Sequence, residues 1–365
     1  MTILFQPSEI APVGNPIAYQ VSGSGVLFLL KLSVETELYS NVFEEVITLD
    51  GPADSAGSAT FELHTVLKGC LAHDLPNLTA TTAFLCKQLC KRYKVAIAEL
   101  QQGDLVDSAV FTEQPVRFAI LASFPWATFP GRSTDIPSTG SLLTTKPLTR
   151  RISREQADFV TFISSTDTTL TATFTVLYTD GTSDLMVKNF GAVRKFEPAI
   201  VPIGFSAQDY AVLSLGRSIR QISVAFGASV VTLIPFSANY LRNVREFYFW
   251  TTGGAFESLV CTGESSQATE HTGEEFQHYV PYNYTLSNPV YRTYNNSLRS
   301  SGKVATGFFR SAGEFEAARE IFNNLQVRER EGSLLLPIVV TSKKSEGRNS
   351  QEALLGFEFE YKRAF

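Results

Sequence analysis

The residues best suited to chemistry stand in one polar stretch near residue 270. His271 and His278 are seven residues apart, with Glu270, Glu274 and Glu275 beside them. Imidazoles and carboxylates can ligate metals or transfer protons. The spacing lacks the H-E-x-x-H arrangement, which places two imidazoles and a base on one helix face. The pattern therefore predicts a solvated polar loop and no metal site.

The four cysteines give no metal or disulfide pattern. Cys86 and Cys90 are four residues apart, and Cys70 and Cys261 stand alone. A zinc ribbon needs two C-x-x-C pairs, which the chain does not contain. We expect reduced thiols, most of them buried.

No motif pairs a nucleophile with a base. The chain has no G-x-S-x-G elbow, and the glycines of residues 22–25 are followed by no Lys-Ser/Thr pair of a phosphate loop. Asp180 stands in a hairpin turn, where Asp is expected for backbone reasons. We therefore predict no catalytic residue, no cofactor and no enzymatic activity.

Charge and hydropathy exclude further classes. The net charge of −5 argues against nucleic-acid binding, which usually shows a basic stripe. The cluster of Arg150, Arg151 and Arg154 predicts a solvated face or an interface rim. No apolar run approaches the roughly 20 residues of a membrane helix. The N-terminus lacks the basic region of a secretory signal, which predicts synthesis in a cytoplasm.

The element around which the chain is organised is an aromatic hairpin in residues 239–263. Residues 244–250 carry four aromatics, which suits a strand. Gly253 and Gly254 supply the positive-φ conformations of a turn. The apolar run 256–260 predicts the returning strand.

The remaining pattern predicts a mainly β protein of three domains. Short strands between turn signals in 1–115 and 116–238 indicate tandem immunoglobulin- or fibronectin-like β-sandwiches. Residues 169–178 are the clearest amphipathic strand, with apolar and Thr side chains alternating. Residues 239–365 predict a C-terminal α+β domain with one helix at about 312–327, for which Ser311 and Glu314 form a capping box.

Aromatic residues suggest where the chain makes contacts. Tyr and Trp offer rigid amphipathic area, which suits a protein interface or a sugar-binding face; ordinary strand aromatics are the alternative. The predicted contact segments are residues 124–145 and 264–294. The candidate contacts are Trp126, Phe129, Trp250, Tyr279, Tyr282, Tyr284, Tyr291 and Tyr294.

An ordered series of short motifs covers nearly the whole chain and ends with the predicted helix and the strand after it. The motifs are residues 15–17, 61–67, 142–147, 152–156, 178–182, 202–205, the aromatic hairpin to Gly253–Gly254, and 335–340. In this order they resemble structural proteins of tailed bacteriophages and prophages. The resemblance implies β-sandwich modules and a place in the virion, in the tail or its distal baseplate, after synthesis in the bacterial cytoplasm. It carries over no catalytic residue.

Three functional hypotheses follow. The first is a non-enzymatic virion protein that assembles with copies of itself, plausibly as a ring, and with other virion proteins. The second is a carbohydrate-binding or adhesive module that stacks sugars of a host-surface glycan on Trp250, Tyr282, Tyr284 and Tyr291. An enzyme is the weakest of the three.

Overall fold

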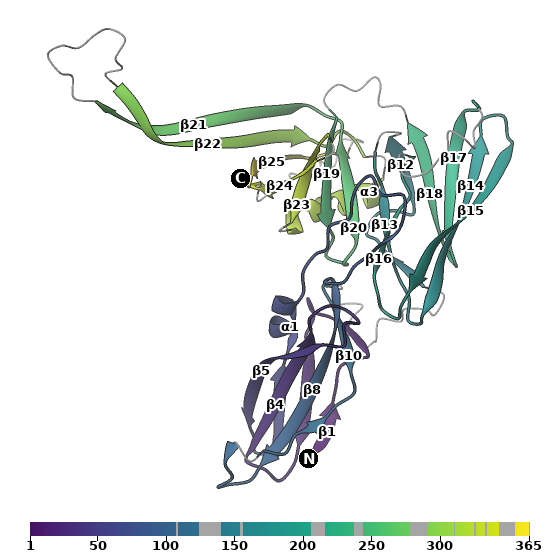
Figure 1. Cartoon of the computed structure of the whole chain (residues 1–365). Helices are drawn as coiled ribbons and strands as arrows, with labels where there is room; N and C mark the ends of the chain where they lie inside the picture. Colours follow the sequence, from purple (N-terminus) through teal and green to yellow (C-terminus); the bar gives the residue numbers. More distant parts are fainter. Residues whose placement is uncertain are drawn as a thin grey trace. The chain divides into compact units, whose positions relative to one another are not determined.

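The structure is a computed structural model that divides into two compact units. It describes residues 1–106, 109–123, 140–153, 156–205, 216–236, 244–277, 291–309, 311–324, 326–332, 334–342 and 355–364, with the backbone alone in 271–277 and 291–299. Unit 1 comprises Met1–Ser237 and Trp250–Glu257, and unit 2 comprises Ala238–Phe249 and Ser258–Phe365. The predicted fold class is confirmed, because both units are built mainly of β-strands (Figure 1).

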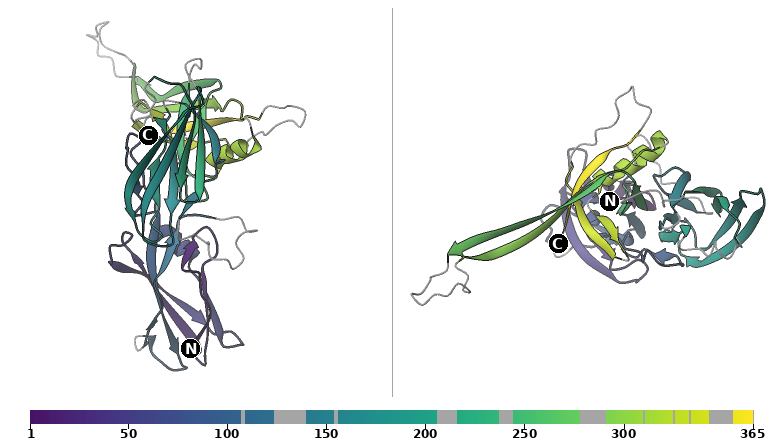
Figure 2. Two further views of the ribbon diagram at one scale, coloured as in Figure 1. Left: turned by 90° about the vertical axis from the view of Figure 1, so that its right-hand side faces the viewer. Right: turned by 90° about the horizontal axis from the view of Figure 1, so that it is seen from above.

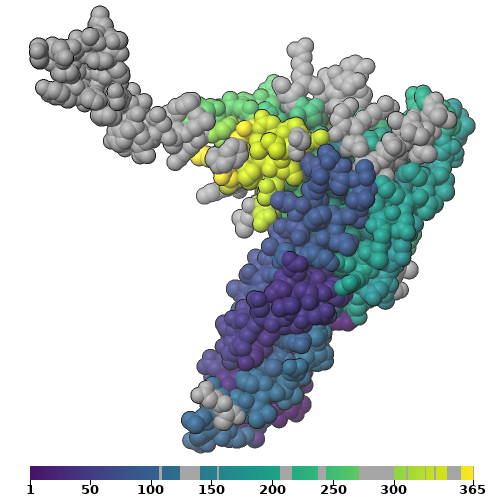
Figure 3. All heavy atoms as spheres, viewed as in Figure 1, coloured from purple at the N-terminus to yellow at the C-terminus, as the bar shows by residue number. Residues whose placement is uncertain are grey.

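The first part of unit 1 is a sandwich of two sheets. The smaller sheet has the order β1-β3-β6, and the larger β2-β10-β8-β4-β5, with β9 paired to β8. Apolar side chains of β3, β4, β6 and β8 alternate inward and form one buried core. Figure 3 shows the outer surface of this part in purple and blue. The strands are β1 Thr2–Phe5, β2 Ile10–Pro12, β3 Ala18–Ser22, β4 Leu27–Glu35, β5 Phe43–Pro52, β6 Ser58–Glu62, β8 Cys90–Leu100, β9 Thr112–Glu113 and β10 Arg117–Ile120; helix α1 is His64–Cys70.

The second part of unit 1 is another sandwich with its own core. Its sheets have the orders β11-β13-β16-β7 and β12-β18-β17-β14-β15. The predicted amphipathic strand is β14, in which Leu170, Phe174 and Tyr178 are buried in this core. The strands are β7 Phe84–Leu85, β11 Ser141–Leu143, β12 Thr149–Ser153, β13 Phe159–Ile163, β14 Thr168–Tyr178, β15 Ser183–Val193, β16 Ala199–Pro202, β17 Ile219–Phe226 and β18 Ser229–Phe236.

The two sandwiches exchange strands across the domain boundary expected at residue 115. Strand β10 follows that boundary but pairs with β2 and β8 of the first sandwich. Strand β7 precedes the boundary but pairs with β16 of the second. A cluster that includes Leu38, Phe118 and Phe196 is buried between them. The sequence could not reveal this exchange, because β7 and β10 are too short to show which sheet they join.

Unit 2 contains a seven-stranded sheet in the order β20-β19-β23-β24-β25-β22-β21. The predicted aromatic hairpin is confirmed as the adjacent strands β19 and β20. The strands are β19 Arg245–Trp250, β20 Phe256–Cys261, β21 Ser265–Gln277, β22 Tyr291–Ala305, β23 Val327–Glu331, β24 Leu334–Val340 and β25 Glu358–Arg363.

The helix of unit 2 is shorter than predicted. Helix α3 spans Ala312–Arg319 and continues as the 3-10 turn η4, Glu320–Asn323. Ser311 caps it as predicted, since its Oγ accepts a hydrogen bond from the Glu314 backbone N–H at 3.2 Å. The predicted end at residue 327 is wrong. Val327 begins β23, whose pairing with β19 and β24 outweighs local helix propensity.

Candidate interaction surfaces

The turn of the β19–β20 hairpin packs within unit 1. Gly254 has a φ of +77°, and a Cβ there would lie 3.2 Å from Cβ of Ala122. The positive φ favours glycine, and the close approach leaves little room for a Cβ. The Ser123 N–H donates to the Thr252 carbonyl at 2.6 Å, which ties the turn to the chain after β10. The glycine signal in the sequence therefore marked a turn at a close approach of two backbones.

Trp250 is not a surface contact, and this part of the prediction is corrected. Its side chain is 1% exposed. Its ring stacks on His73 with centroids 5.1 Å apart and lies 5.5 Å from the ring of Phe256. Strand β19 is buried on both faces from Phe247 to Trp250, so alternation in the sequence could not separate an inward from an outward aromatic.

Glu257, directly after Phe256 on β20, anchors the hairpin to a segment more than 100 residues away in the sequence. Its carboxylate is 1% exposed. One oxygen accepts from the Thr144 hydroxyl at 2.5 Å and from the Thr145 N–H at 2.9 Å, and the other accepts from the Thr145 hydroxyl at 2.9 Å. The Lys146 N–H is 3.3 Å away. These bonds satisfy a buried charge, which would otherwise be costly.

A second buried carboxylate lies close to this anchor. Asp158 accepts from Nζ of Lys146 at 3.2 Å and from Nε of Arg150 at 2.8 Å. Burial alone would raise the pKa of Asp158, but the charges of Arg150 and Lys146 outweigh it and hold the pKa below its usual value. Burial lowers the pKa of Lys146, with a smaller contribution from Arg150. Arg150 is 5% exposed, so the prediction that it lies on a solvated face or rim is wrong.

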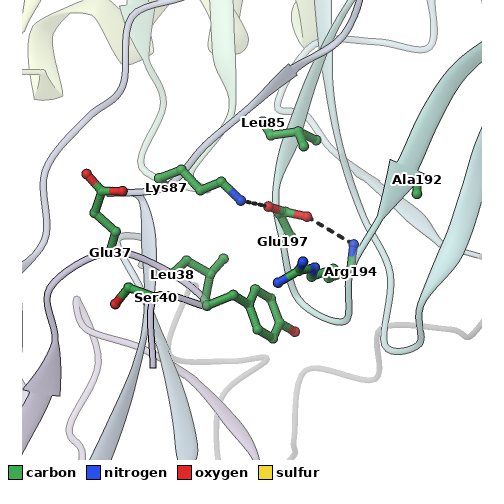
Figure 4. A pocket seen from close by; sticks show the side chains of 9 residues that line it. Glu37, Leu38, Ser40, Leu85, Lys87, Ala192, Arg194 and Glu197 are labelled. Atoms are coloured by element: carbon green, nitrogen blue, oxygen red, sulfur yellow. Dashed lines mark hydrogen bonds and ion pairs between the residues drawn. The ribbon is translucent and has the colours of Figure 1, made fainter. Parts of the chain in front are cut away.

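A hollow of about 470 Å³ lies between the two sandwiches (Figure 4). Lys87 and the Arg194 backbone N–H both donate to the buried carboxylate of Glu197, as the dashed lines show. The hydroxyl of Tyr39 donates to the Lys195 carbonyl. Two of the four charged residues that line the hollow, Lys87 and Glu197, are thus paired with each other, and the other two are Glu37 and Arg194.

Backbone strain is concentrated beside this hollow. The three non-glycine residues with positive φ in the described chain are Tyr39, Asn41 and Phe196. The Tyr39 and Asn41 N–H groups donate to the Glu35 carboxylate, at 2.9 and 2.6 Å. Arg92 also binds this carboxylate and lies 4.8 Å from the Tyr39 ring centroid. These contacts hold the strained backbone in place, so we interpret the region as a structural joint.

Unit 2 carries a two-stranded arm formed by β21 and β22 (Figures 1 and 2). The strands pair antiparallel from Ser265↔Val304 to Gln277↔Tyr291, with a register shift between Thr272 and Glu274. Strand β25 pairs with β22 only along Ser301–Ala305. Beyond that base, the arm has no third strand among the described residues. Both of its long edges therefore present unpaired backbone groups, the usual template for strand addition.

The arm corrects the predicted loop at residues 264–275. Residues 266–270 are all exposed, so neither face of the strand carries the apolar alternation by which strands are recognised. Tyr291 and Tyr294 lie on β22, opposite Gln277 and Glu274 in the register. Trp126, Phe129, Tyr279, Tyr282 and Tyr284 lie outside the described residues, as does His278.

Two further properties of the described residues concern other kinds of site. No described helix is long and apolar enough to cross a membrane. Within the described ranges, no group of three or more His, Cys, Asp or Glu side chains could hold a metal ion. Cys86, Cys90 and Cys261 are buried and Cys70 is partly buried, and all four are free thiols.

The sequence reasoning missed the buried carboxylates Glu35, Asp158, Glu197 and Glu257. Their partners are distant in the sequence or are backbone groups, so no spacing marks them. The sequence contains one signal for the arm, a strand-length segment with only acidic charges followed by one with only basic charges.

Comparison of the chain with known protein families and with curated proteins finds no match.

Proposed function

We propose that this protein is a non-enzymatic structural component of a tailed phage or phage-like particle. It assembles through its β domains, with copies of itself and with other virion proteins, into the tail or its distal baseplate. The resemblance of its ordered motifs to tailed-phage structural proteins supports this proposal. So does the mainly β architecture.

The observation that carries the proposal is the β21–β22 arm. A two-stranded ribbon is at best marginally stable in water, and its open edges favour pairing with another chain. The 13 residues of β21 span about 44 Å at the usual rise of a strand. An extended arm of this kind is suited to assembly, because its backbone groups are satisfied once a neighbour adds a strand.

The glycan-binding alternative has lost support at one position. Trp250 is buried against His73 and Phe256, so it offers no ring face to a sugar. Tyr282 and Tyr284 lie outside the described residues, and Tyr291 is described by its backbone alone. We therefore retain assembly as the proposed function.

Light scattering of the purified protein over a wide range of concentrations tests this proposal. We expect a defined oligomer, which electron microscopy of negatively stained particles should show as a closed ring, because head-to-tail contacts whose rotation closes give a fixed number of copies. A protein that remains monomeric at the highest concentration, and that binds no other virion protein, would contradict the proposal.

A further inference from the structure

The two edges of the arm carry opposite charge. Strand β21 contains Glu270, Glu274 and Glu275 and no Lys or Arg. The outer part of β22, Tyr291–Ser300, contains Arg292 and Arg299 and no Asp or Glu. One edge of the ribbon is therefore acidic and the other basic.

Pairing within the arm brings few of these charges opposite each other. In the register, Glu270 stands opposite Arg299, but Glu274 and Glu275 stand opposite Tyr294 and Thr293. Arg292 stands opposite Phe276. Directly opposed unlike charges stabilise a strand pair, whereas like charges destabilise it. Two of three acids and one of two bases thus have no opposite charge directly across their own arm.

The charges select how two arms can meet. Contact between two β21 edges would join acidic strands, and contact between two β22 edges would join basic strands. Contact between β21 of one copy and β22 of the next joins opposite charges, and unlike-charge complementarity favours this choice. Such a contact uses two different surfaces, so it repeats from copy to copy and forms a ring when the rotation between neighbours closes.

Strand direction agrees with this arrangement. Within one arm, β21 and β22 are antiparallel. When the arms of a rotationally symmetric ring lie along its axis they all point the same way, so β21 of one copy runs antiparallel to β22 of its neighbour. The alternating pattern of the arm then continues across the contact. Because β25 occupies Ser301–Ala305, the neighbour can pair only along Tyr291–Ser300, a length of roughly 30 Å.

We infer that the arm's partner is a second copy of this chain, with the acidic β21 edge of one copy adding to the basic β22 edge of the next. This inference rests on the proposed self-assembly and specifies its contact. The result is a continuous antiparallel sheet made of arms. Added salt should weaken a contact selected by charge, because the screening length falls from about 10 Å at 0.1 M to about 3 Å at 1 M.

Charge reversal of each edge tests the inference. The β21 variant is E270K/E274K/E275K, which makes both edges basic. The β22 variant is R292E/R299E, which makes both edges acidic. Each variant alone should require at least about tenfold more protein than wild type for half-assembly, as measured by light scattering. An equimolar mixture should regain assembly, because the basic β21 edge meets the acidic β22 edge and the unchanged edges also match.

A five-fold variant, which carries all five substitutions of the two edge variants, separates the contact between copies from strand pairing inside one arm. Its edges are again complementary to each other, so it should assemble alone. It should not enter wild-type oligomers, because each mixed contact joins like charges. Differently labelled proteins, mixed as monomers in high salt and returned to low salt, should therefore sort into separate oligomers.

Matched controls reverse exposed charges on unit 1. E44K/E62K/E113K and K68E/R220E change the net charge as much as the two edge variants do, at residues that are exposed. Both should assemble like wild type.

The mass of the wild-type protein in solution distinguishes a failure of the arm contact alone from a failure of the proposed self-assembly. If wild type forms oligomers and the edge variants form them equally well, the arm contact is refuted while the proposed function stands. Free mixing of the five-fold variant with wild type refutes it as well. If wild type is monomeric at every salt and protein concentration, both the arm contact and the proposed self-assembly are overturned.

Discussion

Substitution of Glu257 provides the sharpest test of how the central hairpin is fixed in unit 1. Removal of this carboxylate in Glu257→Ala leaves the Thr144 hydroxyl and the Thr145 N–H without their acceptor. It also removes the partner of the Thr145 hydroxyl. All these groups lie in a region where Glu257 itself is 1% exposed, so water replaces the lost bonds poorly.

The expected loss can be worked from these contacts. A hydrogen bond to a charged group contributes about 1.5–3 kcal/mol net, and each buried group left unsatisfied costs about 1–3 kcal/mol. Contributions within one network are not additive. We therefore expect about 3–5 kcal/mol for Glu257→Ala, the usual range when one partner of a buried charged network is removed. In a unit of this size, that lowers the melting temperature by on the order of 10 °C.

Thermal unfolding monitored by fluorescence measures this loss directly. In a W126F background the signal comes from Trp250, which stacks on His73 in the same unit. Glu257→Gln keeps the shape and part of the accepting capacity, so its loss should be smaller. Glu264→Ala is the matched control, because this glutamate is exposed and lies a few residues after the hairpin. If Glu257→Ala melts within about 2 °C of wild type, the carboxylate is not an anchor and this reasoning is refuted.

Four further predictions concern other buried contacts and the helix cap. Glu35→Ala should destabilise unit 1 by about 3 kcal/mol in calorimetry, because Arg92 loses its buried partner; an unchanged transition would contradict this. Gly204→Ala should lower the yield of folded protein or the melting temperature, since a Cβ would lie 2.7 Å from the Asp158 backbone N; a neutral result would show that the backbone there can yield. Ser311→Ala should cost about 1 kcal/mol in urea unfolding of unit 2, while Ser311→Asp should retain the cap. Finally, the pKa values of Asp158 and Glu35 lie below their unfolded values of about 4, so their stabilisation is full above that pH and is lost as pH falls through the folded pKa values; melting temperatures measured from pH 7 to 2 should drop below about pH 4, and D158N should reduce the drop.

The sequence indicated those elements whose burial differs between two faces. Strand β14 alternates apolar and Thr residues, and its apolar face lies in the core as predicted. The turn at Gly253–Gly254 was recognisable because Gly254 adopts the predicted positive φ, whereas Gly253 does not. The helix start was recognisable from Ser311, a local signal, whereas its end was not, because β23 is fixed by pairing with distant strands.

The arm shows why the rest could not be read from the sequence. An isolated ribbon has no core face, so it needs no apolar alternation, and polar residues there suggest a loop. Its charge pattern can be interpreted only once the register is known. The register decides whether a glutamate of β21 stands opposite an arginine of β22 or opposite an uncharged residue. The prediction that Trp250 is a surface contact was wrong for the opposite reason. A strand that is buried on both faces gives no pattern that separates core from surface residues.

The buried carboxylates indicate how each unit of this protein fixes one alignment of its own strands. Few residues of the chain are charged, 18%, yet Glu35, Glu197, Glu257 and Glu329 are each at most 1% exposed. Each accepts hydrogen bonds from segments far away in the sequence; in unit 2, for example, Glu329 accepts from Arg245 and from the Tyr361 hydroxyl, both at 2.8 Å. A one-residue slip of a strand is already unfavourable, because it moves the apolar side chains to the other face. A two-residue slip keeps the apolar face, but it separates a buried charge from its particular donors. Such anchors therefore select one alignment of strands within each unit.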